Sequence, residues 1–548
     1  MHASRRSSPH LWLLFLLPIC ASAWTRSWWA PDEPRYAEVA REIYASGEFL
    51  VMHLCGEVYR NKPPLLFWMS GFLGSLAHWN EFAMRLPSIL ATLASAWMTA
   101  RLARRFWGED EARLAPILYL TSAMVTWHGA RMQIDPLLGA LCFGALTLAS
   151  EPWKTERSRS RASVAAGFLT GLGVLAKGPI ALLLVGLPLL GWRWIAGRKE
   201  PSLSRSTRAL TVFAALAPGL SWALAVVARK PELAYDLFVG QFFARAVAGT
   251  NHVNPFWYHF ELQPLLMLPW LAPVLGGSWL AWRALRARFR GESFDLGLAL
   301  AGFWFWSLLL AFSLSPEKRD LYLLPAFPAV ALLGARWIVE SVRVTRAGRV
   351  IDVLVPAVLV LAGIALCSAQ LFEARLPLEL RELDWQPIVL GLPLAGAAAF
   401  AAILIWRGEH VRGALALAAG VAFSTTATAI LIFPSIDPLK SARGLSAVLA
   451  ARSERPSAIP TVGVMPEGYR FYSGRPVVHG PSFEATATDA VATLQVEFLE
   501  IARGQGKEFL ALVQRNNWEN WSDETRSHFA ILHEQMVGRR LVMILGAR

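Results

Sequence analysis

Long apolar runs separated by short polar stretches dominate the first 435 residues. A membrane-spanning helix needs about 20 mostly apolar residues, and about thirteen segments approach that length. They cover residues 10–27, 83–103, 112–128, 134–150, 163–178, 179–196, 209–228, 262–282, 295–314, 320–341, 350–371, 386–406 and 414–434. The pattern predicts a polytopic α-helical membrane domain over residues 1–435.

Positive charge alternates from one connecting segment to the next. Short loops rich in Lys and Arg stay on the cytoplasmic side of a membrane. These cations are Arg5 and Arg6, Arg101, Arg104 and Arg105, Lys154–Arg161, Arg198–Arg208, Arg283–Arg290, Arg343–Arg349, and Arg407 and Arg412. The other side receives the loops near 28–81, 129–133, 229–261, 315–319 and 372–385. We therefore predict that loops 28–81 and 229–261 are periplasmic.

The N-terminal run allows a second interpretation. Arg5 and Arg6, the run LWLLFLLPI and then Ala21-Ser22-Ala23 resemble a cleavable signal peptide. Pro18 within the run and the lack of a polar spacer favour a retained span instead. Either outcome leaves Asp32 on the non-cytoplasmic side.

Residues 436–548 are far more polar than those before them. PTVGVM, EFLALV and LVMILG have the length of short buried strands, whereas 438–452 and 483–504 carry helical periodicity. We predict a small α/β domain, which an odd number of spans would place outside the cytoplasm. No internal repeat is visible in the sequence.

Composition supports the membrane assignment and excludes other classes. The chain has 548 residues, of which 55% are hydrophobic and 17% charged, whereas soluble domains carry about 25% charged residues. The net charge of +13 resides in short clusters between apolar runs, so nucleic-acid binding is not expected. The four cysteines, Cys20, Cys55, Cys142 and Cys367, have no metal-binding spacing.

Polar residues of unusual density gather in the predicted periplasmic loops. Carboxylates could orient or deprotonate a nucleophile, and cations could hold a phosphate. The candidates are Asp32, Glu33, Arg35, Tyr36, Tyr59, Lys62, Arg131, Asp135, Lys177, Arg245, Lys318 and Tyr322. Charges at membrane depth are costly and usually functional. We therefore expect these residues to form one site for a phosphate-linked, lipid-borne substrate.

Several candidates also have a purely structural interpretation. Asp32 and Glu33 could stabilise a helix N-terminus, where carboxylates favour the dipole. Arg131 and Asp135 could form an ion pair at the end of a span. Lys318 could belong to an ordinary charged loop. The pair Trp28-Trp29 is expected at the membrane interface, where it would fix the depth of the loop.

Two motifs carry a resemblance to a known family. D-E-P-R-Y (32–36) and Y-R-N-K-P-P (59–64) resemble the first periplasmic loop of the C-type polytopic glycosyltransferases that use polyprenyl-phosphate sugars. Within that family the sequence is most similar to the enzymes that add 4-amino-4-deoxy-L-arabinose to lipid A, relatives of protein O-mannosyltransferases. RMQIDPLL, LAKGPIALLL, NHVNPFWYHF and SPEKRDLYLLPAFPAVALL extend the resemblance over about residues 10–435.

The resemblance implies roles for particular positions. It implies that Asp32 is the catalytic carboxylate and that Asp135 is a second acid. It also implies donor-phosphate contacts for Arg35, Tyr59, Lys62, Arg245 and Tyr322. Members often carry Glu before the motif lysine, a residue linked to a divalent cation, but this chain has Asn61. A metal is therefore not carried over; a divalent cation stays possible and no cofactor is assigned.

The implied reaction is an inverting transfer of a sugar from undecaprenyl phosphate to lipid A. Cations would stabilise the departing lipid phosphate while the anomeric carbon gains oxocarbenium character. Asp32 would deprotonate a hydroxyl acceptor, or would orient the reactants if the acceptor is a lipid A phosphate. A protein-directed or other hydroxyl-directed glycosyltransferase is the near alternative. A membrane transporter or lipid flippase is the alternative from another class.

Overall fold

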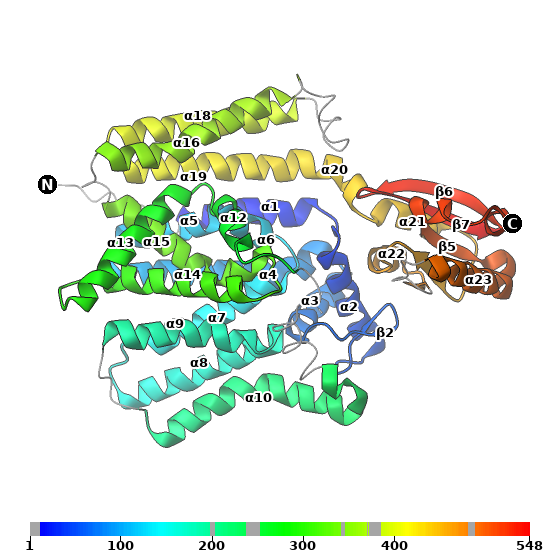
Figure 1. Cartoon of the computed structure of the whole chain (residues 1–548), viewed down its shortest axis with the longest axis horizontal. Coiled ribbons are helices and arrows are strands. Elements are labelled where there is room, and N and C mark those ends of the chain that lie inside the picture. Colours follow the sequence, from blue (N-terminus) through cyan, green and yellow to red (C-terminus); the bar gives the residue numbers. More distant parts are fainter. Residues whose placement is uncertain are drawn as a thin grey trace. The chain divides into compact units, whose positions relative to one another are not determined.

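The computed structural model describes residues 11–197, 203–236, 253–340, 346–369, 371, 385–480 and 488–548. The chain divides into two compact units (Figure 1). Unit 1 comprises residues 1–24, 60–66 and 85–431, and unit 2 comprises residues 25–59, 67–84 and 432–548. The predicted domain boundary at residue 435 separates the first loop from the C-terminal residues. In the structure, unit 2 contains both of them.

Long helices build unit 1, and each of the predicted apolar segments coincides with one helix or with consecutive helices. The helices are η1 (Leu11–Leu16), α1 (Leu17–Thr25), α4 (Glu81–Phe106), α5 (Glu109–Thr121), α6 (Ala123–Gly129), α7 (Ile134–Ser150), α8 (Glu156–Lys177), α9 (Ile180–Ala196), α10 (Arg205–Arg229), η2 (Pro231–Leu233), α12 (Tyr258–Leu266), α13 (Leu271–Phe289), α14 (Leu296–Leu314), η4 (Asp320–Ala326), α15 (Phe327–Glu340), α16 (Arg346–Cys367), α18 (Gln386–Trp406), α19 (His410–Ala427) and the π-helical η7 (Thr428–Ile432).

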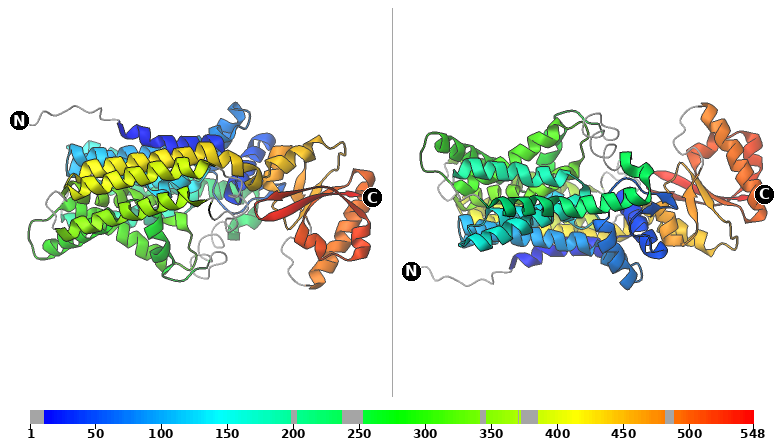
Figure 2. Two further views of the ribbon diagram at one scale, coloured as in Figure 1. Left: turned by 90° about the horizontal axis from the view of Figure 1, so that it is seen from above. Right: turned by 90° about the horizontal axis from the view of Figure 1, so that it is seen from below.

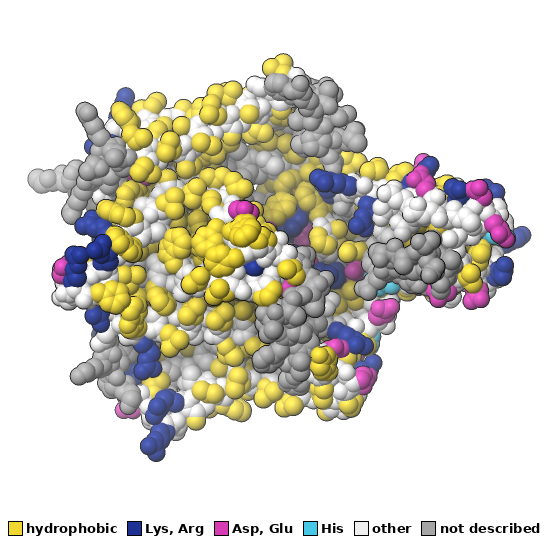
Figure 3. Space-filling view, viewed as in Figure 1, with side chains coloured by type: hydrophobic (Ala, Val, Ile, Leu, Met, Phe, Trp, Pro, Cys, Tyr) yellow, Lys and Arg dark blue, Asp and Glu magenta, His cyan; other side chains and the backbone are white. Residues whose placement is uncertain are grey.

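Six helices within the described ranges are long and apolar enough to cross a membrane, or up to eight if each bent pair is one span. Large apolar side chains on these helices are exposed, among them Phe213, Leu361 and Leu392. Figure 3 shows a broad hydrophobic surface over these helices, with Lys and Arg gathered at its left end. The predicted number of about thirteen spans is not confirmed.

Small residues allow close contacts between helices in unit 1. Helices α8 and α10 lie side by side (Figures 1 and 2). A Cβ atom at Gly167 or Gly171 would collide with the backbone carbonyl of Thr211 or Ala214. Such close backbone approach is typical of helix packing in membranes, where dispersion replaces the hydrophobic effect.

Unit 2 combines the first loop with the C-terminal residues. The loop contributes α2 (Asp32–Ser46), a hairpin of β1 (His53–Leu54) and β2 (Glu57–Val58), and α3 (Leu65–Leu76). Cys55 and Gly56 make the hairpin turn with φ of 54° and 88°, the left-handed values that a two-residue turn requires.

The C-terminal residues form a mixed five-stranded sheet of order β4-β3-β5-β7-β6. The predicted strands correspond to β3, β5 and β7, while β4 and β6 were not predicted. The elements are α20 (Phe433–Lys440), α21 (Arg443–Ala451), β3 (Ile459–Val462), α22 (Glu467–Ser473), β4 (Val477–His479), α23 (Thr488–Gln505), η8 (Gly506–Glu508), β5 (Leu510–Gln514), α24 (Arg515–Glu519), α25 (Asp523–Ser527), β6 (Phe529–Val537) and β7 (Arg540–Ala547).

Helices cover both faces of the sheet at β3 and β5, which explains why these two strands are buried along nearly their whole length. Along β5, Leu510 and Leu512 pack with α21 and α22 on one face. Ala511 and Val513 alternate with them and pack with Phe498 of α23 on the other. Because successive side chains of a strand point to opposite faces of the sheet, β5 contributes to two separate hydrophobic cores.

Candidate active-site residues

The motif acid Asp32 begins helix α2 and is buried, with 4% of its surface exposed. Arg35, one turn later, donates from Nη2 to Asp32 Oδ1 at 2.5 Å. The spacing of three residues puts the two side chains on one face of the helix. A carboxylate in the first turn is also stabilised by the helix dipole. The pair is therefore fixed by its own helix.

Two tyrosines surround Arg35. Tyr36 and Tyr59 are buried, and each packs edge-on against Phe67, with ring centroids 5.5 and 5.6 Å apart. Burial lowers the pKa of the Arg35 guanidinium, but Tyr59, Tyr36, Asp32 and Glu467 outweigh it, so its pKa lies above the usual value. Its Nε is buried without a hydrogen-bond partner. Arg35 is thus a permanent cation with donor capacity to spare.

Glu467 of α22 also acts on Arg35, and no motif in the sequence pointed to it. It is 4% exposed, and burial raises the pKa of its carboxyl, an effect that Arg35 opposes. It lies 432 positions beyond Arg35 in the chain, so no spacing pattern could have connected the two.

Glu33 has a different role from its neighbour. Its Oε2 accepts from Nη1 of Arg26 at 2.9 Å, and both side chains are fully buried. Consecutive helical residues point about 100° apart, so Asp32 and Glu33 face different surroundings. A buried pair of this kind is structural, since removing either partner leaves an uncompensated charge. Glu33 is therefore a poor catalytic candidate.

The expected interfacial position of Trp28 and Trp29 is wrong. Trp28 is 1% and Trp29 7% exposed, because both pack inside unit 2. Trp28 contacts Phe471 edge-on, and Trp29 Nε1 donates to Asp437 at 2.7 Å. The pair fixes the first loop to the C-terminal residues by burial and hydrogen bonding.

An ion-pair cluster ties the middle of α2 to α22. Arg470 Nε lies 3.0 Å from Glu38 Oε1 and 2.9 Å from Glu42 Oε1. Arg41 adds a bidentate contact to Glu38. Burial raises the pKa of Glu38 to about 7, although the hydrogen bond from Arg41 opposes the shift. The cluster fixes the helix that carries Asp32 and Arg35.

A second polar group lies within unit 1. Lys177 ends α8, and Gly178, with a positive φ of 88°, turns the chain into α9. Lys177 Nζ donates to Asp135 Oδ1 at 2.5 Å and lies 4.5 Å from the ring centre of Tyr322. Asp135 begins α7 and is 3% exposed. Three predicted residues from separate helices thus meet.

The remaining candidates are more dispersed. Arg131 stacks on Trp127 at 4.2 Å, while Asp135, its predicted partner, accepts from Lys177. Lys318 is buried and donates to the carbonyls of Asn254 and Ser315, which indicates a structural role. Lys62 is half-buried just before α3. Arg245 lies outside the described residues. That all candidates serve one site stays a prediction.

A metal site is not evident within the described ranges. No group of three or more His, Cys, Asp and Glu side chains there is placed to hold a metal ion. The buried His128 Nε2 and the half-buried Asp320 Oδ2, 3.3 Å apart, supply only two such groups.

Comparison with known proteins identifies the architecture. Residues 61–227 match the family described as dolichyl-phosphate-mannose-protein mannosyltransferase. The crystal structure of ArnT from Cupriavidus metallidurans bound to undecaprenyl phosphate superposes with a TM-score of 0.77 at 21% identity, covering 98% of both chains. The chain has the fold of ArnT. The predicted fold class, a polytopic helical membrane protein of the glycosyltransferase C-type, is confirmed.

Curated relatives extend the similarity to ArnT. An undecaprenyl phosphate-alpha-4-amino-4-deoxy-L-arabinose arabinosyl transferase of Edwardsiella ictaluri is 32% identical over 333 residues, which cover 60% of this chain and 58% of that protein. Transferase 1 of Pseudomonas fluorescens is 29% identical over 379 residues, 68% of this chain and 64% of that protein. The chain thus spans less than two thirds of these relatives. The resemblance predicted from the motifs is confirmed.

Proposed function

We propose that the protein is an inverting membrane glycosyltransferase that moves 4-amino-4-deoxy-L-arabinose from undecaprenyl phosphate to lipid A at the periplasmic face of the inner membrane. The observation that carries the proposal is the ArnT fold over 98% of the chain. The names of the curated relatives support the donor and the sugar. The lipid A acceptor and the periplasmic orientation rest on the sequence.

Arg35 is proposed to hold the donor phosphate together with Lys62. Guanidinium binds phosphate through two parallel hydrogen bonds, so the spare Nε of Arg35 suits it to this ligand. As the bond between sugar and phosphate breaks, negative charge grows on the phosphate. A cation already in place stabilises this charge without reorganisation. Tyr59 and Tyr36 fix the orientation of Arg35 by packing beside it.

Asp32 is proposed to act on the acceptor or on the sugar. For a hydroxyl acceptor, its carboxylate takes the proton as the oxygen attacks the anomeric carbon. A lipid A phosphate already carries about −1.5 to −2 charge and needs no base, so Asp32 then orients the reactants. Its ion pair with Arg35 holds the carboxylate in one orientation in either case.

Asp135, Lys177 and Tyr322 are proposed as a second functional group. Lys177 carries a positive charge between a carboxylate and an aromatic face. In this arrangement Lys177 could bind an anionic head group or hold Asp135 in position for catalysis. We keep Asp135 as the alternative catalytic carboxylate.

A hydroxyl-directed glycosyltransferase is the second candidate function. The match of residues 61–227 to a protein mannosyltransferase family favours it. A transporter or flippase is disfavoured, because the chain has the fold of ArnT and its candidate residues lie at helix ends.

Lipid A mass spectrometry distinguishes these functions. The gene is expressed in a bacterial strain that makes the aminoarabinose donor but lacks its own transferase. We expect lipid A to gain the mass of one or two aminopentose units. A matched strain carrying Asp32→Asn serves as the control. Unmodified lipid A alongside glycosylated protein or glycan would replace the proposal with the second candidate.

A further inference from the structure

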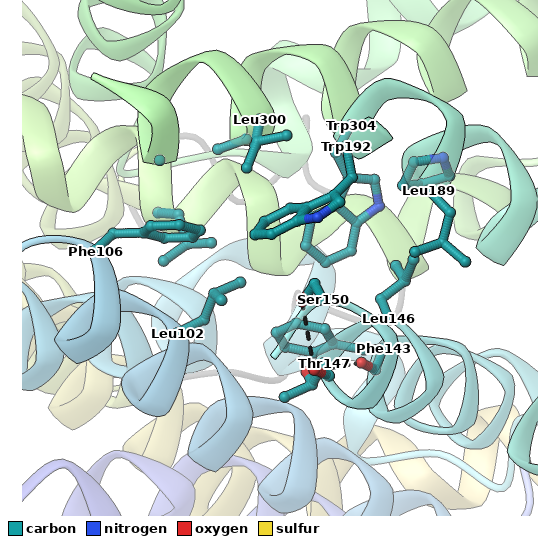
Figure 4. Close-up of a pocket in the computed structure, with 14 residues that line it drawn as sticks. Leu102, Phe106, Phe143, Leu146, Thr147, Ser150, Leu189, Trp192, Leu300 and Trp304 are labelled. Carbon is teal, nitrogen blue, oxygen red and sulfur yellow. Dashed lines mark hydrogen bonds between the residues drawn. The ribbon is translucent and has the colours of Figure 1, made fainter. Parts of the chain in front are cut away.

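Unit 1 contains an apolar cavity between helices α4, α7, α9 and α14 (Figure 4). Its hydroxyl groups, those of Thr147 and Ser150, donate to carbonyls of α7 at 2.9 and 3.4 Å. The described residues that line it include no charged side chain. A polar ligand finds more specific partners in unit 2, among the arginines beside the C-terminal sheet.

Three arginines lie where the strands of this sheet begin. Strands β3, β4 and β5 run parallel, so the segments that precede them meet at one end of the sheet. Arg452 and Arg455 belong to the segment between α21 and β3, and Arg475 belongs to the segment between α22 and β4. Glu508 ends η8, just before β5. The tertiary structure thus brings together cations that are far apart in the sequence.

The guanidinium groups of Arg455 and Arg475 approach one oxygen atom. Arg455 Nη1 donates to the Glu454 carbonyl at 3.0 Å, and Arg475 Nη2 donates to the same carbonyl. Two nitrogens that share one acceptor lie within about 6 Å of each other. Two like charges at this distance repel each other. Burial and Arg455 accordingly lower the pKa of the Arg475 guanidinium, although Glu454 and Glu508 oppose the shift.

The carboxylates of this group are engaged elsewhere. Glu454 accepts two hydrogen bonds from Arg452, at 3.2 and 2.5 Å. Glu508 accepts from the backbone N–H of Arg455. Within the part of the chain that the structure describes, the guanidinium groups of Arg455 and Arg475 contact carbonyls and form no ion pair. Arg475 Nε is buried there without a hydrogen-bond partner.

We propose that Arg455 and Arg475 form a binding site for a phosphate group. A guanidinium binds phosphate through two parallel hydrogen bonds, and Arg475 Nε is a donor suited to one of them. A dianionic phosphate between the two groups replaces their mutual repulsion by attraction to a shared ligand. Arg455 is exposed, so a ligand reaches it from solvent. Free phosphate and the phosphate monoester of a lipid head group share this chemistry.

The proposed site is separate from the group around Arg35. Glu467, which acts on Arg35, is the first residue of α22, whereas Arg475 follows the last residue, Ser473. At about 1.5 Å per residue the helix alone separates its two ends by roughly 9 Å. Failure of this site would therefore leave the proposed transfer reaction unaffected.

Hydrogen–deuterium exchange of the purified full-length protein tests the proposal, because it reports on residues 452–458 and 474–479 separately from the first loop. Exchange is compared in sodium phosphate and in sodium chloride of equal ionic strength and pH. A ligand that must leave before an amide exchanges slows the exchange by about tenfold at ten times its Kd. We expect phosphate to slow exchange by this amount in both segments.

A second arm distinguishes the sources of the phosphate group. The protein is placed in mixed micelles that contain phosphatidic acid or phosphatidylcholine with the same acyl chains. Protection by inorganic phosphate supports a site that accepts the free anion. Protection by phosphatidic acid alone supports a site for a lipid head group. Equal protection by phosphatidylcholine, which lacks a phosphate monoester, overturns the proposal.

Three variants make the test specific. Arg455→Gln and Arg475→Gln should each remove the protection, because the phosphate loses one of its two guanidinium partners. Arg526→Gln removes one positive charge from the same domain, but Arg526 pairs with Asp523 at 2.5 Å, so this control should keep the protection. In chloride, Arg455→Gln should melt at or above the wild-type temperature, because the repulsion is relieved.

The proposal is overturned if phosphate protects neither segment, if Arg455→Gln keeps the protection, or if Arg526→Gln loses it. Should Arg475→Gln fail to fold, Arg455→Gln at the exposed position decides the test.

Discussion

Asp32 combines burial, a helix N-terminus and an ion pair with Arg35, which together hold one carboxylate in one orientation. Asp32→Asn keeps the size of the side chain but removes its charge and basicity. We expect the transfer rate to fall by about 100-fold or more, while donor binding weakens little. Single-turnover transfer from purified undecaprenyl-phosphate aminoarabinose, run beside a donor-binding assay, measures both.

The control for this variant is Glu57→Gln, an exposed carboxylate in the same loop. It should transfer at the wild-type rate. Wild-type turnover by Asp32→Asn would reduce Asp32 to a residue that stabilises the start of α2. Asp135 would then become the candidate carboxylate.

Lys62 tests the proposed stabilisation of the leaving phosphate. Lys62→Ala removes one charge-assisted contact, which in a partly dry site costs roughly 2–4 kcal/mol, or about 30- to 1000-fold in turnover. The variant should remain inserted and keep its melting temperature. Near-full turnover in membranes would show that Lys62 does not contact the phosphate.

The sequence could identify Asp32, Arg35 and Tyr59 because local motifs contain them. It could not identify Glu467 or Arg470, because they reach α2 only through the tertiary structure. The interfacial position predicted for Trp28 is wrong for the same reason. An aromatic pair after an apolar run is typical of a membrane belt. The contacts of Trp28 with Phe471 and Tyr472, which bury it, form only in the folded chain.

At the scale of elements, helix α2 depends on the cluster of Glu38, Glu42 and Arg470. An unfolded Glu titrates near pH 4.3, whereas burial raises the pKa of Glu38 to about 7. Between these values the folded state binds more protons than the unfolded state. The stability from this group is therefore complete below about pH 4.3 and is lost as the pH rises through 7, a loss of about 3–4 kcal/mol.

Glu38→Gln resembles the protonated carboxyl at every pH. We expect its melting temperature to match wild type at pH 4 and to fall less than wild type between pH 4 and pH 8. Scanning calorimetry in detergent at both pH values measures the difference. Glu57→Gln should follow the wild-type curve. A Glu38→Gln curve that runs parallel to wild type would mean that Glu38 is ionised throughout the range.

At the scale of the whole molecule, apolar periodicity sufficed to predict which segments are helical, because a bilayer allows few alternatives to the helix. The number of spans stays a prediction. Helix α4 contains Arg85, which is fully buried and donates to the Ala23 carbonyl at 2.7 Å. This arginine lowers the mean hydropathy of α4 although its side chain lies inside the helix bundle. The chain also bends by 118° between α12 and α13, inside the predicted span 262–282, and by 113° between α6 and α7, where two predicted spans meet.

Membrane orientation therefore needs a direct test. Every role proposed for the first loop requires it to lie outside the cytoplasm, and the same parity of spans exports the C-terminus. Unit 2 contains both segments, joined by the contacts of Ser27 and Trp29 to Asp437, so they must lie on one side of the membrane. Alkaline phosphatase fused after Arg548 should be active, whereas a fusion after Arg198, within a predicted cytoplasmic cluster, should be inactive. Both fusions must be present at equal levels by immunoblot. The reverse pattern would place Asp32, Arg35 and Glu467 in the cytoplasm and would exclude transfer to a periplasmic acceptor.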